Sequence, residues 1–123
     1  MKKVVFYGRY SSQLQTEQSI EGQLHVCERY AEQNDMKIVE HYIDRAITGK
    51  TDKRPEFQRM IADSKKGNFQ AVLVYKLDRF ARNRYDSALY KKKLRDNGVK
   101  VVSATENITD TPEGIIMEGL LEA

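Results

Sequence analysis

The chain has few of the residues that build disulfides and metal centres. Among 123 residues there is one cysteine, Cys27, and there are two histidines, His25 and His41. A single cysteine cannot form an internal disulfide, which fits a protein of the reducing cytoplasm. Zinc sites need about four Cys, His or carboxylate ligands in one place, so we expect neither a metal nor a metal-dependent reaction. Cys27 falls on the apolar face of an expected helix, which favours a core residue over a reactive thiol.

Long apolar runs are also missing. The longest, "VVFY" and "AVLVY", have the length of a β-strand and not of a membrane span, and no secretory leader is visible. We therefore expect a cytoplasmic protein without a membrane partner.

The charges are unevenly distributed although the net charge is only +3. Residues 76–96 contain eight Lys or Arg and three acids, whereas residues 104–123 contain five acids and no base. A basic zone of this kind suits a polyanionic partner such as nucleic acid, but a solvated helix face produces the same pattern, so charge alone does not decide.

Apolar segments alternate with helical patterns along the chain. We expect strands at 2–8, 36–43, 70–75 and 99–104, and helices at 19–34, at 55–67 and from the basic segment to about 97. Ser19 is the expected cap of the first helix, and Gly67 and Gly98 are the expected stops of the other two. This order predicts an α/β fold with a mainly parallel four- to five-stranded sheet flanked by helices.

The last residues, "TPEGIIMEGLLEA", read as the start of an amphipathic helix that has no stop signal. We expect residues 1–110 to form the domain and residues 111–123 to begin a longer helix that continues in a larger protein.

Basic and hydroxyl side chains follow three of the expected strands. In parallel sheets, ligands bind at the carboxyl ends of the strands, so these residues are expected to converge there. Arginine's planar fork suits phosphate, and a serine beside a bound phosphate could attack it. If Arg79 and Arg82 share one helical turn, both side chains point the same way. The candidate residues are Arg9, Ser11 and Ser12, then Arg45 to Arg54, then Lys76, Asp78, Arg79 and Arg82.

Purely structural roles also remain possible for these residues. Ser11 and Ser12 fit a simple turn, Asp78 fits a helix cap, and no general base is identifiable because both histidines fall on expected structural elements. The sequence has no GxSxG nucleophile motif, which argues against a serine hydrolase of the α/β-hydrolase kind. It also has no complete GxxxxGK[ST] phosphate loop, which argues against a P-loop nucleoside triphosphatase.

Five segments, taken in order, resemble the serine recombinases, the resolvase/invertase superfamily of site-specific DNA recombinases. They are "YGRYSS", "SIEGQ", "TGKTDKRPEFQRM", "YKLDRFARN" and "KVVSATENITDTPEG". The residues of "SIEGQ" and "RPEF" most resemble those of the large serine recombinases, which include phage integrases and transposon enzymes.

The resemblance implies a role for individual residues. Ser11 matches the nucleophile that becomes joined to a 5′ phosphate of DNA, and Ser12 is its neighbour. The other implied catalytic residues are Arg9, Asp78, Arg79 and Arg82. The implied phosphate-binding or supporting residues are Arg54, Gln23, Tyr7 and Lys76.

The resemblance also implies the partners. Family members bind the DNA backbone at the crossover site, form dimers and a synaptic tetramer, and use no cofactor. We expect the isolated 123 residues to be unable to complete recombination. Two alternatives stay open: a module that binds phosphate or nucleic acid without chemistry, and a recombinase-derived module kept for protein contacts.

Overall fold

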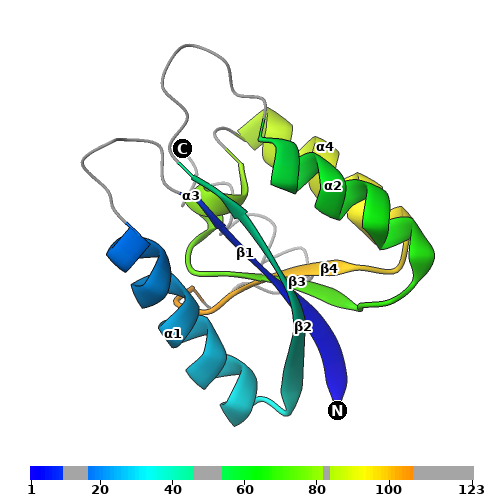
Figure 1. Ribbon diagram of the computed structural model, residues 1–123. Coiled ribbons are helices and arrows are strands. Elements are labelled where there is room, and N and C mark those ends of the chain that lie inside the picture. Colours follow the sequence, from blue (N-terminus) through cyan, green and yellow to red (C-terminus); the bar gives the residue numbers. More distant parts are fainter. Residues whose placement is uncertain (10–16, 46–53, 82–83, 107–123) are drawn as a thin grey trace.

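A computed structural model describes residues 1–9, 17–45, 54–81 and 84–106, which form a single parallel sheet with helices on both faces (Figure 1). The strands are β1 (Lys2–Arg9), β2 (Met36–Asp44), β3 (Ala71–Val74) and β4 (Lys100–Ser103). The helices are α1 (Glu17–Gln33), α2 (Pro55–Asp63), the 3-10 turn η1 (Ser64–Lys66), α3 (Leu77–Phe80) and α4 (Arg84–Asp96). The strand order is β2-β1-β3-β4 and every pairing is parallel, which confirms the predicted α/β fold.

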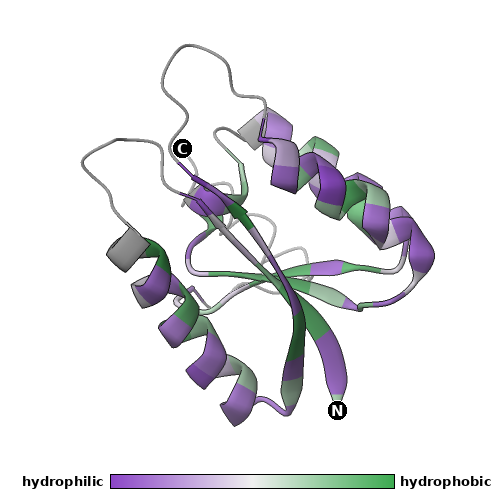
Figure 2. Ribbon diagram, in the orientation of Figure 1, coloured by the Kyte–Doolittle hydropathy of each residue, from purple (hydrophilic) through white to green (hydrophobic). Residues whose placement is uncertain are grey.

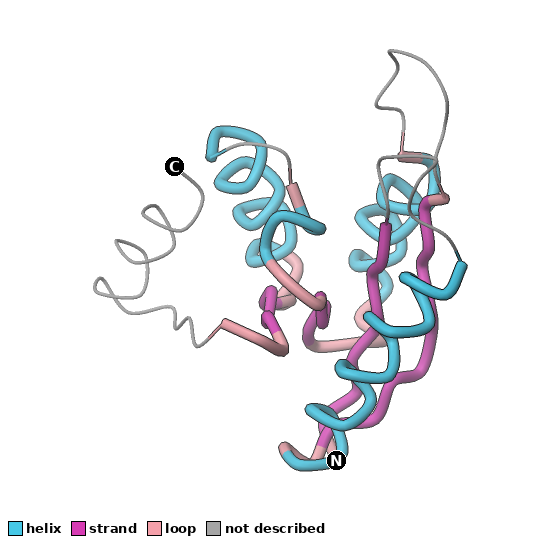
Figure 3. Tube along the Cα trace, turned by 90° about the vertical axis from the view of Figure 1, so that its left-hand side faces the viewer, coloured by secondary structure: helices cyan, strands magenta, loops and turns pink. Residues whose placement is uncertain are grey.

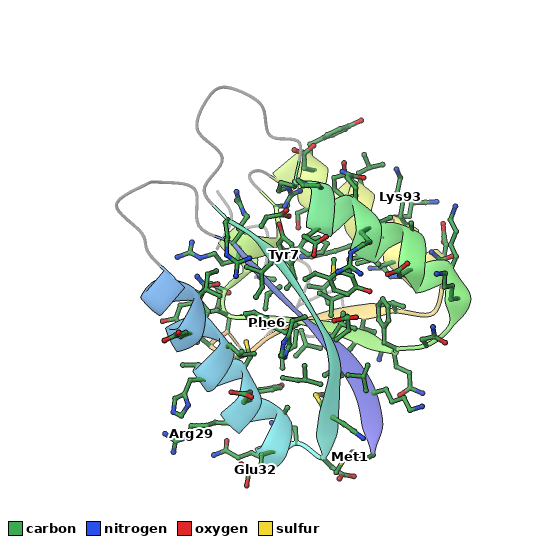
Figure 4. All side chains as sticks on the ribbon, in the orientation of Figure 1. Met1, Phe6, Tyr7, Arg29, Glu32 and Lys93 are labelled. Atoms are coloured by element: carbon green, nitrogen blue, oxygen red, sulfur yellow. The ribbon has the colours of Figure 1, made fainter. Side chains whose placement is uncertain are left out.

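Neighbouring residues of β1 belong to two different cores because side chains alternate along a strand. Val5 and Tyr7 lie in the core shared with α2 and α4, whereas Val4 and Phe6 lie in the core shared with α1. Figure 4 shows the labelled rings of Phe6 and Tyr7 on the central strand. All four side chains are fully buried, which explains why the segment is apolar without alternation.

The helices form one layer on each side of the sheet. In Figure 1, α1 lies on one side of the strands and α2 and α4 lie on the other, and in the quarter-turned view of Figure 3 α1 lies in front of the strands. Apolar residues follow the strands, and polar residues colour the outward faces of the helices in Figure 2. Arg29 and Glu32 of α1 and Lys93 of α4 accordingly point away from the sheet (Figure 4).

Two glycines end helices as predicted. Gly67 follows η1 with φ 73° and Gly98 follows α4 with φ 77°, both in the left-handed region that glycine enters at little cost. Pro55 is the first residue of α2, where its missing N–H has no helical partner to lose. The prediction for Ser19 is wrong: α1 begins at Glu17, so Ser19 lies inside the first turn and does not precede it.

The shared helical turn expected for Arg79 and Arg82 is also wrong. Helix α3 ends at Phe80, and Ala81 is extended with φ −147° and ψ 153°. Arg79 therefore lies in a four-residue helix that stops before position 82, and Arg82 itself lies outside the described residues.

Candidate functional site

The candidate site lies at the carboxyl edge of the sheet, where β1 and β3 are neighbours. The chain moves from β1 outward to β2 on one side and later to β3 on the other, so the ends of β1 and β3 flank the point where the strand order reverses. Ligands of open parallel sheets bind at such points. Arg9 is the last residue of β1, and α3 begins three residues after β3 ends.

Helix α3 is the meeting point of two arginines from distant segments. Arg9 donates from Nε to the carbonyl oxygen of Arg79 at 3.1 Å, and Arg54 donates from Nη1 to the carbonyl oxygen of Phe80 at 2.5 Å. These carbonyls end α3, where the partial negative charge of the helix favours cations. The main chain of Arg79 is thus held beside Arg9 and Arg54, although 70 and 26 positions separate the bonded residues.

Arg54 is held more firmly than a surface arginine. Its exposed fraction is 6%, and its Cζ lies 3.8 Å from the centre of the Phe57 ring and 6.0 Å from that of Tyr90. Its backbone has φ 40° and ψ 65°, a left-handed conformation that costs a residue with a Cβ about 1 kcal/mol. The following Pro55 disfavours the ordinary helical alternative at this position. Stacking and hydrogen bonding together fix the direction of the guanidinium.

Asp44 supports the same region and was not among the residues predicted from the sequence. Its Oδ2 accepts hydrogen bonds from Tyr7 Oη at 2.8 Å and from the Phe57 N–H at 3.0 Å, and its Oδ1 accepts one from the Glu56 N–H at 3.0 Å. The carboxylate therefore caps the start of α2 directly after Arg54 and ties it to β1. The position at the end of an expected strand was the only sequence signal.

Tyr7 is a buried hydrogen-bond donor. Burial raises the pKa of Tyr7 above its ordinary value, and the nearby Asp44 carboxylate raises it further. The phenol consequently stays neutral and donates its proton to Asp44. Through Asp44, Tyr7 is linked to the start of α2, directly after Arg54.

Gln23 reaches from α1 to the end of β1. Its Nε2 donates to the carbonyl oxygen of Arg9 at 3.3 Å, and its exposed fraction is 3%. Its Oε1 is buried and accepts no hydrogen bond from the described residues. Gly8 leaves room for the Phe6 ring, because a Cβ at that position would lie 2.7 Å from Phe6 Cζ, whereas its distance of 3.5 Å from Gln23 Oε1 would be an ordinary contact. The packing thus fixes the backbone around Arg9.

The structure describes only some of the remaining predicted residues. Arg79 is half-buried in α3, and Lys76 is exposed, with its Nζ 5.8 Å from the centre of the Tyr75 ring. Asp78 belongs to α3, but its side chain is outside the description, as are Ser11, Ser12 and Arg82. The structure therefore brings together Arg9, Arg54 and the main chain of Arg79.

The described residues offer neither a metal site nor a membrane span. Residues 1–9, 17–45, 54–81 and 84–106 contain no group of three His, Cys, Asp or Glu suited to a metal ion. None of the helices within these ranges has the length and apolar character required to cross a membrane.

The model of the resolvase N-terminal domain family matches residues 4–123. The chain belongs to the resolvase family. This resolvase domain is 34% identical to the N-terminal catalytic domain of TP901-1 integrase, with a TM-score of 0.78 over 98% of this chain and 91% of that one. TP901-1 integrase is a large serine recombinase, so the likeness to that subgroup is confirmed.

Other solved structures agree with this assignment. A resolvase-family site-specific recombinase from Streptococcus pneumoniae is 33% identical, with a TM-score of 0.83 over 98% of this chain and 85% of that one. The IS607-like serine recombinase ISC1926 TnpA shares the fold at 23% identity, with a TM-score of 0.72 over 94% and 76% of the two chains. A comparison with curated protein sequences gave no significant match. By family and fold the chain is a serine recombinase catalytic domain, which implies DNA recombination, DNA binding and oligomerisation in general terms.

Proposed function

We propose that this domain breaks and rejoins DNA through a covalent bond to Ser11. The observation that carries the proposal is the convergence of Arg9 and Arg54 on the carbonyl end of α3, the helix that contains Asp78 and Arg79. Guanidinium groups from three segments provide the positive charge and the planar donors that a phosphodiester and its transition state require.

The reaction is a phosphoryl transfer between two alcohols. Ser11 Oγ releases its proton and forms a bond to phosphorus, the bond from phosphorus to the 3′ oxygen breaks, and the 3′ oxygen takes up one proton and leaves as a hydroxyl, so the step consumes no net proton. Arg79 is the proposed donor of that proton, and Arg9, Arg54 and Arg82 stabilise the negative charge on the phosphate oxygens. Asp78 orients the arginines, and Lys76 contributes charge near the DNA backbone.

Rejoining is the same step in reverse. A 3′ hydroxyl of an exchanged strand attacks the phosphoserine, Ser11 leaves, and the phosphodiester forms again. One ester replaces another in each direction, so no nucleotide cofactor is needed. We further propose that the domain works in the cytoplasm in a dimer and a synaptic tetramer, with residues 1–110 as the domain and residues 111–123 as the start of the long helix.

A trapping assay tests the proposal. The complete gene product, mixed with DNA that carries its crossover site and a nick beside the scissile phosphate, should accumulate a protein–DNA adduct. We expect Ser11→Ala to abolish the adduct, whereas the matched variant Ser12→Ala should keep it. A protein that binds this DNA but forms no adduct would favour the non-catalytic phosphate-binding module. An adduct that survives Ser11→Ala would refute Ser11 as the nucleophile and assign the bond to another residue.

A further inference from the structure

The first N–H of α3 is bound by a side chain from the far end of the described chain. Glu106 Oε1 accepts the Leu77 N–H at 2.8 Å across 29 positions, while the N-cap residue Lys76 makes no side-chain capping bond. Ser103 Oγ lies 3.0 Å from the same Glu106 oxygen and accepts the Glu106 N–H at 3.2 Å. The carboxylate is therefore oriented by its own turn before it reaches α3.

Adjacent hydrogen bonds align the segment after β4 with the segment after β3. The Ala104 N–H donates to the Val74 carbonyl at 2.8 Å, and Thr105 Oγ1 donates to the Tyr75 carbonyl at 2.7 Å. The contact between Glu106 and Leu77 is the next bond along this seam. Unlike the other two hydrogen bonds, it connects the segment after β4 to helix α3 of the candidate site.

Helix α3 is consequently held at both ends by charges that match its dipole. A carboxylate binds its amino end, and the guanidinium groups of Arg9 and Arg54 bind its carbonyl end. An isolated helix of four residues is not stable in water, so its conformation depends on these contacts. Removing the carboxylate leaves the arginines attached to a helix whose amino end is held by the packing of the buried Leu77 side chain without a capping hydrogen bond.

We propose that Glu106 is a positioning residue for the recombination chemistry. It locks the α3 turn, and with it the main chain of Asp78 and Arg79, relative to Arg9 and Arg54. The inference rests on the proposed function. It adds Glu106, which follows β4, to the residues that arrange the site. It assigns Glu106 no contact with DNA.

Amide exchange tests the positioning directly. The variants are Glu106→Ala, Glu106→Gln, which retains an acceptor oxygen, and the matched control Thr105→Val, which removes the neighbouring bond to Tyr75. Loss of a hydrogen bond to a charged acceptor shifts a local equilibrium about tenfold. We expect the Leu77 and Arg79 amides to exchange about tenfold faster in Glu106→Ala than in Thr105→Val, as followed by NMR. Equal exchange in these two variants would overturn the positioning role.

Adduct formation by the complete gene product tests the consequence for chemistry. We expect the single-turnover rate at saturating DNA to fall about tenfold in Glu106→Ala, with the half-saturating DNA concentration changed by less than about threefold. Glu106→Gln should restore the rate to within about threefold of wild type, since its amide oxygen accepts the same N–H. An Ala variant as fast as Thr105→Val would overturn the inference. A Gln variant as slow as the Ala variant would overturn it too, because the amide oxygen can keep the hydrogen bond to the Leu77 N–H on which the positioning depends.

The two proposals fail in distinguishable ways. A wild-type protein that forms no adduct refutes the proposed function and the catalytic half of this inference. A wild-type protein that forms the adduct, together with unchanged α3 exchange in Glu106→Ala, refutes the role of Glu106 alone. If Glu106→Ala does not fold, Glu106→Gln still tests the proposal, because loss of exchange protection at Leu77 or loss of rate in the Gln variant relative to Thr105→Val would overturn it.

Discussion

Replacing Asp44 by asparagine should destabilise the domain far more than its single-atom change suggests. The carboxylate accepts three hydrogen bonds, from Tyr7 Oη and from the N–H groups of Glu56 and Phe57, and the residue is only 5% exposed. An asparagine has one acceptor oxygen. If that oxygen keeps the hydrogen bonds to Tyr7 and Phe57, the NH₂ group of the asparagine faces the Glu56 N–H. Two donors then meet and the Glu56 N–H has no acceptor.

The expected magnitude follows from those contacts. A buried donor left without a partner costs about 1–3 kcal/mol, and the two surviving bonds lose the strength that a charged acceptor gives them. We therefore expect Asp44→Asn to lower the free energy of unfolding by about 3 kcal/mol. Tyr7→Phe removes one of the three bonds without adding a misplaced donor, so about 1.5 kcal/mol is expected.

Urea denaturation followed by circular dichroism measures both losses from the midpoint and the slope. Asp63→Asn is the matched control, because Asp63 Oδ2 accepts a phenol at the same distance, 2.8 Å from Tyr42 Oη, on a side chain that is 25% exposed. It should cost about 1 kcal/mol or less. An Asp44→Asn variant that is no less stable than Asp63→Asn would refute the claim that Asp44 anchors α2 and β1.

Two further predictions concern packing and burial. Gly8→Ala should lower the free energy of unfolding by about 1–3 kcal/mol, because its Cβ would lie 2.7 Å from Cζ of the fully buried Phe6. Gly22→Ala on α1 is the control and should be neutral or stabilising, because nothing lies within 4 Å of its Cβ. Equal melting temperatures for the two variants would contradict this prediction. Burial raises the pKa of Cys27 from 9.0 to about 12, so iodoacetamide should alkylate it roughly a thousandfold more slowly in the folded protein at pH 8.5 than in urea. Because the folded pKa is the higher one, the stabilising effect of burying this thiol is complete below pH 9.0 and is lost as the pH rises toward about 12; labelling at the same rate with and without urea would exclude the buried position.

The sheet was predictable from sequence because its signals are local. "VVFY" and "AVLVY" are apolar at consecutive positions, which marks strands covered on both faces, and Gly67 and Gly98 stand where helices stop. The approach of Arg9 and Arg54 to the segment after β3 followed from one topological rule, that parallel strands end at the same edge. These features need no knowledge of a distant side chain.

Asp44 and Glu106 were not predictable because their partners are distant in sequence. Asp44 binds residues 12, 13 and 37 positions away, and Glu106 binds a backbone N–H at 29 positions. An acidic residue after a strand is compatible with a surface position, a cap or a ligand, and only the packed structure decides. Glu106 lies in the family motif "KVVSATENITDTPEG", whereas Asp44 lies in none of the five motifs, and a motif does not state from which peptide N–H a carboxylate accepts a hydrogen bond.

The end of α3 at Phe80 illustrates the same limit and explains the arrangement of the site. "DRFARNR" contains no glycine or proline, so nothing local predicts a stop. In a continuous α-helix the carbonyls of Arg79 and Phe80 would accept N–H groups four residues further on. Here they accept Arg9 Nε and Arg54 Nη1 instead. The two guanidinium groups compete with helix continuation for these acceptors, so the contacts that gather the arginines also favour ending the helix.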